Sequence, residues 1–276
     1  MDSGCIDFFS SGISILYNEP ELTTGDSGQT HEVQFEGLPK FILQIPDTPP
    51  KNVFLFAHHL WKGCVLLSRL IMDQKYCAIR QKTCLELGAG AGLCGIVANV
   101  IGAKFVVSSD YPEPFILDKL HRNMEKNCIN TNWQVNGHLW GTHSFVKSPI
   151  LSKFDVILMS DTLWMSDQHS NLLNSINLFL ENEGVVLGVA GFHTGLDVIE
   201  SFIEMARQAG FIAQIMDYVH VPIGNGLCEN MEWLIAKKEN VSREIDDRKR
   251  FMVVYTLRKG KRSQETNEQI AKPNHH

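Results

Sequence analysis

The sequence predicts an α/β protein built on a doubly wound, mostly parallel seven-stranded sheet, with an antiparallel last strand and an N-terminal hairpin extension. Between residues 81 and 259, short apolar runs alternate with amphipathic segments, as strands and helices that take turns do. The apolar runs are nearly continuous, which is typical of strands covered by helices on both faces. A polar stretch instead of an amphipathic helix separates the last two runs, so we expect the last strand to be antiparallel.

The individual elements follow in order from the same patterns. Before residue 50, the runs HEVQFE and KFILQI are joined by Gly37-Leu38-Pro39 and predict a hairpin. Apolar residues at helical spacing predict a helix over 57–71. Of the remaining runs, those interpreted as strands are, in order, KTCLEL, AKFVVSSD, WQVNGHLW, FDVILMSD, GVVLGVAG, FIAQIMDY and RFMVVYTLR. Those interpreted as helices are GAGAGLCGIVANVIG after the first strand, EPFILDKLHRNMEKN after the second, HSNLLNSINLFLE after the fourth and GLDVIESFIEMARQAG after the fifth.

Length and composition favour one main domain. A chain of 276 residues, 44% of them hydrophobic, can bury a sizeable core. We therefore expect an extension with a β-hairpin over residues 1–50, one α/β domain over 51–260 and a flexible polar tail over 261–276.

Charge and cysteine usage limit the partners and the compartment. A formal net charge of −6 gives no basic excess for binding phosphate backbones, so no nucleic-acid partner is expected. The seven cysteines form no CxxC pair and the first residues lack a basic region, which together predict a cytoplasmic protein. The uncharged run Leu87–Ala103 is rich in glycine and shorter than the ~20 residues of a membrane span, so no membrane segment is predicted.

The adjacent histidines His58 and His59 are not expected to bind a metal. Neighbouring residues on a helix point about 100° apart, and no HExxH or carboxylate pattern accompanies this pair. Cys84 and Cys94, on either side of a glycine-rich turn, are interpreted as small packing residues. The sequence therefore predicts no metal site.

The stretch LELGAGAGLCG is the first indication of chemistry. Glycine lets the backbone approach a ligand closely, and the helix that follows offers free N–H groups. Two patterns overlap in this turn: residues 90–95 match the dinucleotide fingerprint GxGxxG, and residues 86–92 match the acidic-x-GxGxG pattern of S-adenosylmethionine enzymes. Asp110, at the end of the second strand, suits both, because its carboxylate can accept hydrogen bonds from two ribose hydroxyls.

The run MSDTLW helps to decide between the two patterns. It places Asp161 at the end of the fourth strand, beside the first strand, where the reacting end of a cofactor would lie. A hydride-transfer enzyme has no need of a carboxylate there. A methyl-transfer enzyme can use one to bind the ammonium of the cofactor's methionine part or to position an incoming amine.

Four runs carry a resemblance to a known family: FAHHLWKG, CLELGAGAGLCGIVANVIGAKFVVSSDYPE, NGHLWG and MSDTLW. They resemble the class I seven-strand methyltransferases of the protein-lysine group. Within it, the chain is most similar to the fungal branch labelled nicotinamide N-methyltransferase-like. Members of this branch include methyltransferases that act on the N-terminus and nearby lysine of translation elongation factor 1-alpha. The resemblance covers residues 30–260 and implies S-adenosylmethionine as cofactor and a protein, such as that elongation factor, as partner.

The resemblance also implies a set of site residues. Gly88, Gly90 and Gly92 would form the cofactor turn, and Asp110 would hold the ribose. The implied cofactor-binding set is Trp61 near the methionine part, Glu86, Gly88, Gly90, Gly92, Asp110, Tyr111, Trp140 beside the adenine, and Asp161. Because an aromatic-lined pocket with one carboxylate can guide an ammonium and favour its loss of a proton, our hypothesis is that Asp161 and Trp164, with Trp61 nearby, are the catalytic residues that line the acceptor pocket. Trp164 stands where many relatives have the tyrosine of an Asp-x-x-Tyr motif, so the target residue stays open.

Other interpretations of the same residues remain. The glycine turn could be a plain strand-to-helix connection, Asp161 could cap a helix that begins near His169, and Trp61 and Trp140 could be core residues. At the level of function, the alternatives are methylation of a small nicotinamide-like acceptor, a non-catalytic cofactor-binding partner protein and an NAD-dependent oxidoreductase. The sequence leaves the oligomeric state open.

Overall fold

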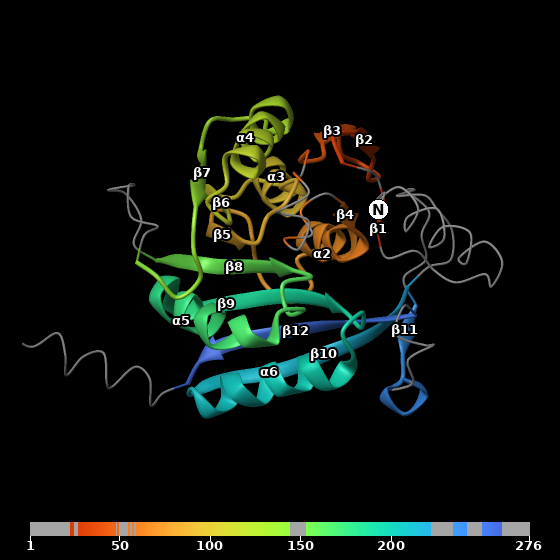
Figure 1. The fold of residues 1–276 in the computed structure, drawn as a ribbon, viewed down its shortest axis with the longest axis vertical. Coiled ribbons are helices and arrows are strands. Elements are labelled where there is room, and N and C mark those ends of the chain that lie inside the picture. The colour runs from red at the N-terminus through yellow and green to blue at the C-terminus, as the bar shows by residue number, and fades with distance from the viewer. Residues whose placement is uncertain are drawn as a thin grey trace, which may run out of the picture.

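The molecule is built around one mixed sheet of eight strands. The computed structural model describes residues 23–24, 27–47, 49, 55, 57, 59–143, 153–221, 234–241 and 250–260. The strand order is β11-β10-β12-β9-β8-β5-β6-β7 (Figure 1). The strands are β5 (Thr83–Leu87), β6 (Phe105–Asp110), β7 (Trp133–Gly137), β8 (Phe154–Ser160), β9 (Leu180–Gly191), β10 (Phe211–His220), β11 (Ile235–Ala236) and β12 (Phe251–Lys259).

The predicted direction of the strands is confirmed. Strands β5 to β9 pair in parallel, and β12 pairs antiparallel with both β9 and β10. The last strand therefore lies inside the sheet, between the fifth and sixth strands of the predicted set. An eighth strand, β11, comes from a stretch that was expected to be a loop. Its two residues are too short to show any hydrophobic period.

Helices cover both faces of the sheet (Figure 1). Residues on α2 (Lys62–Asp73), α3 (Leu93–Val100) and α4 (Pro114–Asn127) share one core cluster. Residues on α5 (His169–Phe179) and α6 (Leu196–Gln208) share the other. Within β5, Cys84 belongs to the first cluster and Leu85 to the second, because successive side chains of a strand point to opposite faces. The doubly wound prediction is thus confirmed.

The predicted N-terminal hairpin is present and packs on α4. Strands β2 (Thr30–Val33) and β3 (Phe41–Gln44) pair antiparallel. The side chain of Asn123 on α4 accepts the N–H of Gln44 at 2.8 Å and donates to its carbonyl at 2.9 Å. Asn127, one turn later, repeats this exchange with Ile42. Two amide side chains therefore satisfy the backbone of β3 as a neighbouring strand would.

Two boundaries differ from the sequence prediction. The helix expected over 57–71 begins only at Lys62, because β4 (Leu60–Trp61) is extended and pairs antiparallel with β1 (Thr23–Thr24). Strand β9 begins at Leu180, before the predicted start, since its exposed polar residues hide the strand pattern. The polar tail predicted over 261–276 lies outside the described residues, and so does His58.

No helix in the described part of the chain is long and apolar enough to cross a membrane.

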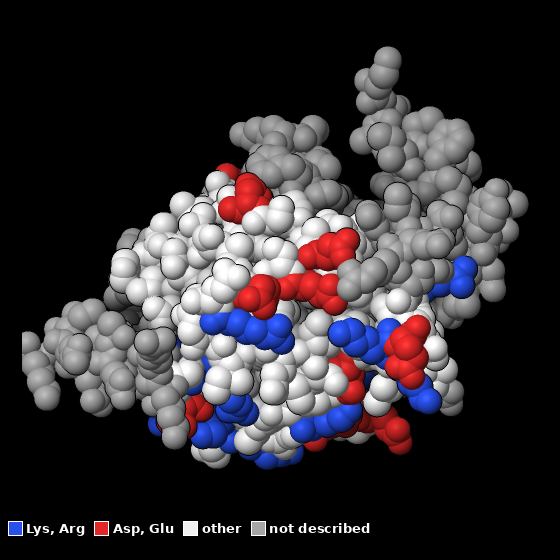
Figure 2. All heavy atoms as spheres, turned by 90° about the horizontal axis from the view of Figure 1, so that it is seen from below, with Lys and Arg blue, Asp and Glu red and all other residues white. Residues whose placement is uncertain are grey.

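Figure 2 shows the face that lies below the view of Figure 1, where Lys and Arg side chains are interspersed with Asp and Glu. The described residues of this face therefore form no large area of a single charge. Such an arrangement gives no support to binding of a phosphate backbone over this face.

Candidate functional site

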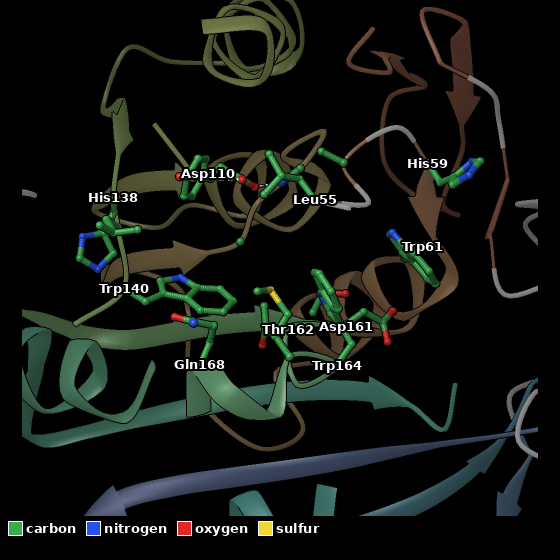
Figure 3. A pocket seen from close by; sticks show the side chains of 17 residues that line it. Leu55, His59, Trp61, Asp110, His138, Trp140, Asp161, Thr162, Trp164 and Gln168 are labelled. Carbon is green, nitrogen blue, oxygen red and sulfur yellow. Dashed lines mark hydrogen bonds between the residues drawn. The ribbon is translucent and has the colours of Figure 1, made fainter. Parts of the chain in front are cut away.

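A pocket of about 350 Å³ opens where β5, β6 and β8 end (Figure 3). This is the edge of the sheet at which ligands of open α/β folds bind, next to the point where the strand order reverses. Of the site residues predicted from the sequence, those that line it are Trp61, Gly88, Gly90, Asp110, Tyr111, Trp140, Asp161 and Trp164. The structure therefore brings together residues that are up to about a hundred positions apart in the chain.

Asp110 holds the glycine turn against the end of β6. Its Oδ2 accepts the N–H of Gly90 at 2.7 Å, and its Oδ1 accepts the N–H of Tyr111 at 2.7 Å. Burial raises the pKa of Asp110, and these two N–H donors lower it in part. The carboxylate is thus fixed at the pocket wall, with lone pairs left for further donors such as hydroxyl groups.

Gly88 is required by a close approach inside the pocket wall. Its φ is 70°, and a Cβ built there would lie 2.8 Å from Cγ2 of Thr162 and 3.6 Å from the ring of Trp140. A larger residue at this position would displace the threonine and fill space beside the tryptophan. The turn is therefore more than a short connection, because its shape keeps the pocket open between two strand ends.

Glu86 and Gly92 lie behind the turn and do not line the pocket. Oε2 of Glu86 accepts the N–H of Gly95 at 3.0 Å and the hydroxyl hydrogen of Ser108 at 2.7 Å. Burial raises the pKa of Glu86 to about 7. Gly92 occupies the cap position before α3 with a φ of 84°, and a Cβ there would lie 2.5 Å from Cδ1 of Leu120. Both residues shape the turn from below.

Asp161 ties three elements together at the pocket floor. Its φ of 49° is in the left-handed region, which non-glycine residues rarely adopt. Oδ1 accepts the N–H of Gly191 at the end of β9 at 2.7 Å, and Oδ2 accepts that of Gly63 in the first turn of α2 at 3.1 Å. Asp161 therefore caps α2, whereas α5 follows the cap residue Gln168.

Three half-buried tryptophans form the aromatic walls of the pocket. In Figure 3, Asp161 and Trp164 lie between Trp140 on one side and Trp61 on the other. None of the three tryptophans is a buried core residue. The described lining also contains two aspartates and neither lysine nor arginine. Aromatic faces and carboxylates attract cations, so this composition suits a positively charged ligand.

Sequence reasoning missed several lining residues. His138 follows β7, and burial lowers the pKa of its ring to about 4, so the imidazole is neutral near pH 7. Ser160 and Thr162 flank Asp161 in the lining; the hydroxyl oxygen of Ser160 is buried without a hydrogen-bond partner among the described residues, whereas the hydroxyl of Thr162 interacts with that of Tyr255. Both lie in the run MSDTLW at a strand end, which was the available signal, but only Asp161 and Trp164 of that run are predicted site residues.

Comparison with known proteins identifies the family of this chain. Residues 49–208 match the family model described as lysine methyltransferase. The chain belongs to the lysine methyltransferase family. It is 34% identical over 182 residues to the protein N-terminal and lysine N-methyltransferase efm7 of Schizosaccharomyces pombe, which covers 61% of this chain and 70% of that relative.

Solved structures show the same fold. The candidate RNA methyltransferase PH1948 from Pyrococcus horikoshii superposes with a TM-score of 0.53 at 16% identity and covers 79% of this chain and 93% of that one. SMU.776, a candidate methyltransferase complexed with SAH, superposes with a TM-score of 0.55 at 10% identity. The match covers 84% of this chain and 57% of that one. Family and fold together make this lysine methyltransferase family member an S-adenosylmethionine-dependent enzyme. This result favours, of the two overlapping glycine patterns, the one from S-adenosylmethionine enzymes.

Proposed function

We propose that this methyltransferase transfers methyl groups to an amine of a protein, either an N-terminal amine or a lysine. The observation that carries the proposal is the composition of the pocket lining. Its described residues include tryptophans and aspartates but neither lysine nor arginine. A sulfonium cofactor and an ammonium acceptor are both cations, and both are stabilised by such walls. The family description and the name of the Schizosaccharomyces pombe relative support the same class of acceptor.

The pocket residues fit the cofactor that the family uses. When bound, S-adenosylmethionine supplies a methyl group activated by its sulfonium. Asp110 would accept hydrogen bonds from the ribose hydroxyls, and Gly88 and Gly90 would let the backbone come close. Ser160 and Thr162 belong to the same lining. Trp140 would flank the adenine, as the resemblance implies.

The acceptor amine must be aligned and must lose a proton. At pH 7 an α-amine with a pKa of about 8 costs roughly 1 kcal/mol to deprotonate, whereas a lysine with a pKa near 10.4 costs almost 5 kcal/mol. Trp61 and Trp164 can guide the cation and then desolvate it, which favours the neutral form. Alignment of donor and acceptor can contribute a further 7 to 11 kcal/mol, by order of magnitude.

Asp161 serves this reaction as a fixed negative charge. Both of its oxygens already accept backbone N–H groups, so the carboxylate is held in place rather than free to swing toward a substrate. Burial raises the pKa of Asp161, and the nearby His193 is the largest influence that lowers it. The proposed role of Asp161 and Trp164 is therefore to position and stabilise the amine at the reacting end.

Elongation factor 1-alpha is the proposed substrate, on the strength of the family resemblance. Modification of a translation factor would place the enzyme in the cytoplasm. The test incubates the purified protein with tritiated S-adenosylmethionine and a lysate of cells that lack it, and then locates the label by gel and mass spectrometry. The variant Asp110→Asn, whose cofactor binding is expected to be weakened, serves as the control at limiting S-adenosylmethionine.

Label on one band of elongation factor size, at its N-terminus or a lysine, supports the proposal. Label found only in the small-molecule fraction contradicts it and favours a nicotinamide-like acceptor. Binding of S-adenosylmethionine without any labelled product contradicts it in another way and favours a non-catalytic partner protein. Each outcome is reduced in the Asp110→Asn sample at limiting S-adenosylmethionine if it depends on this pocket.

A further inference from the structure

A second cluster lies behind the acceptor end of the pocket and consists of Trp61, Asp161 and His193. The three residues come from β4, the end of β8 and the segment after β9. Nε2 of His193 lies 3.6 Å from Oδ1 of Asp161. The imidazole ring lies 5.0 Å from the ring of Trp61, at an interplanar angle of 46°. No motif in the sequence marks His193, and it does not line the pocket itself.

The cluster begins with a buried charge that needs a partner. The side chain of Asp161 is 3% exposed, and two backbone N–H groups compensate it only in part. In the described part of the chain, His193 is the basic side chain that comes within 4 Å of this carboxylate. His193 itself is 20% exposed, and its Nδ1 is buried without a hydrogen-bond partner among the described residues. The position of its ring therefore depends on Asp161.

The imidazole ring of His193 also packs on the ring of Trp61. Trp61 is the cap residue before α2, and its extended backbone pairs with Thr23 of β1. These contacts fix its main chain, but its ring is half-buried and lines the pocket. A ring at the reacting end of a transferase must hold its orientation, because an error of about 1 Å there can cost a hundredfold in rate.

We propose that His193 is a positioning residue, which Asp161 holds in place and which in turn fixes the Trp61 ring against the methyl acceptor. This inference rests on the proposed function, because the acceptor is the amine described above. Loss of His193 then acts on the chemical step through Trp61 and leaves the ribose and adenine end of the pocket intact. The effect is expected to be much larger on kcat for the acceptor than on the affinity for the cofactor, of which Trp61 would contact only the methionine part.

A double-mutant cycle with Trp61 tests the inference. The variants are His193→Ala, Trp61→Ala and the double variant, with His220→Ala as matched control. His220 is an exposed histidine at the end of β10 whose ring packs on Phe251 at 4.7 Å, away from the pocket. Methyl transfer is measured with the acceptor found by lysate labelling, and cofactor binding is measured by calorimetry.

We expect His193→Ala to lower kcat by roughly ten- to a hundredfold and to change the dissociation constant of S-adenosylmethionine by no more than about twofold. In the Trp61→Ala background the same change should alter kcat by no more than about twofold, because the ring to be positioned is gone. His220→Ala should match the wild type. Additive losses in the double variant, or an equal loss of cofactor affinity, would overturn the inference.

A fluorescence measurement separates this inference from the proposed function. The emission difference between wild type and Trp61→Phe isolates Trp61, and His193→Ala should shift it to longer wavelength and increase its quenching by iodide. An unchanged Trp61 emission overturns the positioning role. If the wild type labels no protein at all, the proposed function fails, and the fluorescence result still decides whether His193 positions Trp61.

Discussion

Glu86 gives the fold a pH-dependent stability that one substitution should remove. Its carboxyl group is buried beneath the glycine turn, and this burial raises its pKa from 4.5 to about 7. Because the pKa is higher in the folded state than in the unfolded state, the folded protein binds this proton more tightly. The resulting stabilisation is fully present below pH 4.5 and is lost as the pH rises through about 7.

The size of the effect follows from the two pKa values. The difference between about 7 and 4.5, at ~1.36 kcal/mol per unit, corresponds to roughly 3 kcal/mol, most of which falls between pH 5 and pH 8. In the variant Glu86→Gln no proton titrates, and the amide oxygen can still accept the N–H of Gly95 or the hydroxyl of Ser108. The variant should therefore gain about 2 to 3 kcal/mol in free energy of unfolding, relative to wild type, from pH 5 to pH 8.

Urea unfolding at several pH values, followed by tryptophan fluorescence, measures this difference directly. Glu125→Gln, which makes the same exchange at an exposed carboxylate on α4, is the matched control. A Glu86→Gln difference that is constant with pH would refute the reasoning. It would mean that Glu86 is ionised throughout and that Ser108 and Gly95 fully compensate its charge.

Two further predictions concern the glycine turn and Asp110. Gly92→Ala should lower the free energy of unfolding by about 1 to 3 kcal/mol, because its positive φ is combined with a clash against Leu120. Gly90→Ala, with a φ of 53° and nothing within 4 Å of the added Cβ, should cost less in the same urea experiment; equal losses would show that the clash does not matter. Asp110→Asn should weaken S-adenosylmethionine binding about ten- to a hundredfold by calorimetry, since hydrogen bonds to a charged acceptor are replaced by neutral ones. Unchanged affinity would exclude Asp110 from the ribose contact.

The main sheet could be predicted because its strands are buried on both faces. Continuous apolar runs such as those of β5 and β8 are distinctive, and the order of runs fixed the parallel part of the sheet. The two-residue strands β4 and β11 were not predictable, because they form through pairing with distant segments and carry no period of their own. Leu60 was assigned to a helix for the same reason, although its backbone is extended.

The pocket residues that lie at the ends of predicted strands could be predicted from the sequence. Those that reach the site from other elements of the fold could not. Gly88 and Asp110 lie at the ends of recognisable strands, so their meeting follows from the order of the sheet. His193 belongs to no motif, and Gly63 ends the run FAHHLWKG without any sign there of a contact with Asp161. Both reach Asp161 only because α2 and the segment after β9 converge on the end of β8. A single sequence contains no local signal for such a convergence.

The position of Asp161 means that one residue affects both the proposed reaction and the stability of the fold. A Cβ at position 63 would lie 2.0 Å from its Oδ2, so the carboxylate fits against α2 only because that residue is glycine. Removal of the Asp161 carboxylate would leave the buried N–H groups of Gly63 and Gly191 without an acceptor. Each would lower the free energy of unfolding by about 1 to 3 kcal/mol. Loss of activity in an alanine variant would therefore reflect a displaced α2, and with it a displaced Trp61, as much as a missing charge at the acceptor. Asparagine keeps one acceptor oxygen and the shape while removing the charge, so comparison of the two variants separates the contribution of charge from that of position.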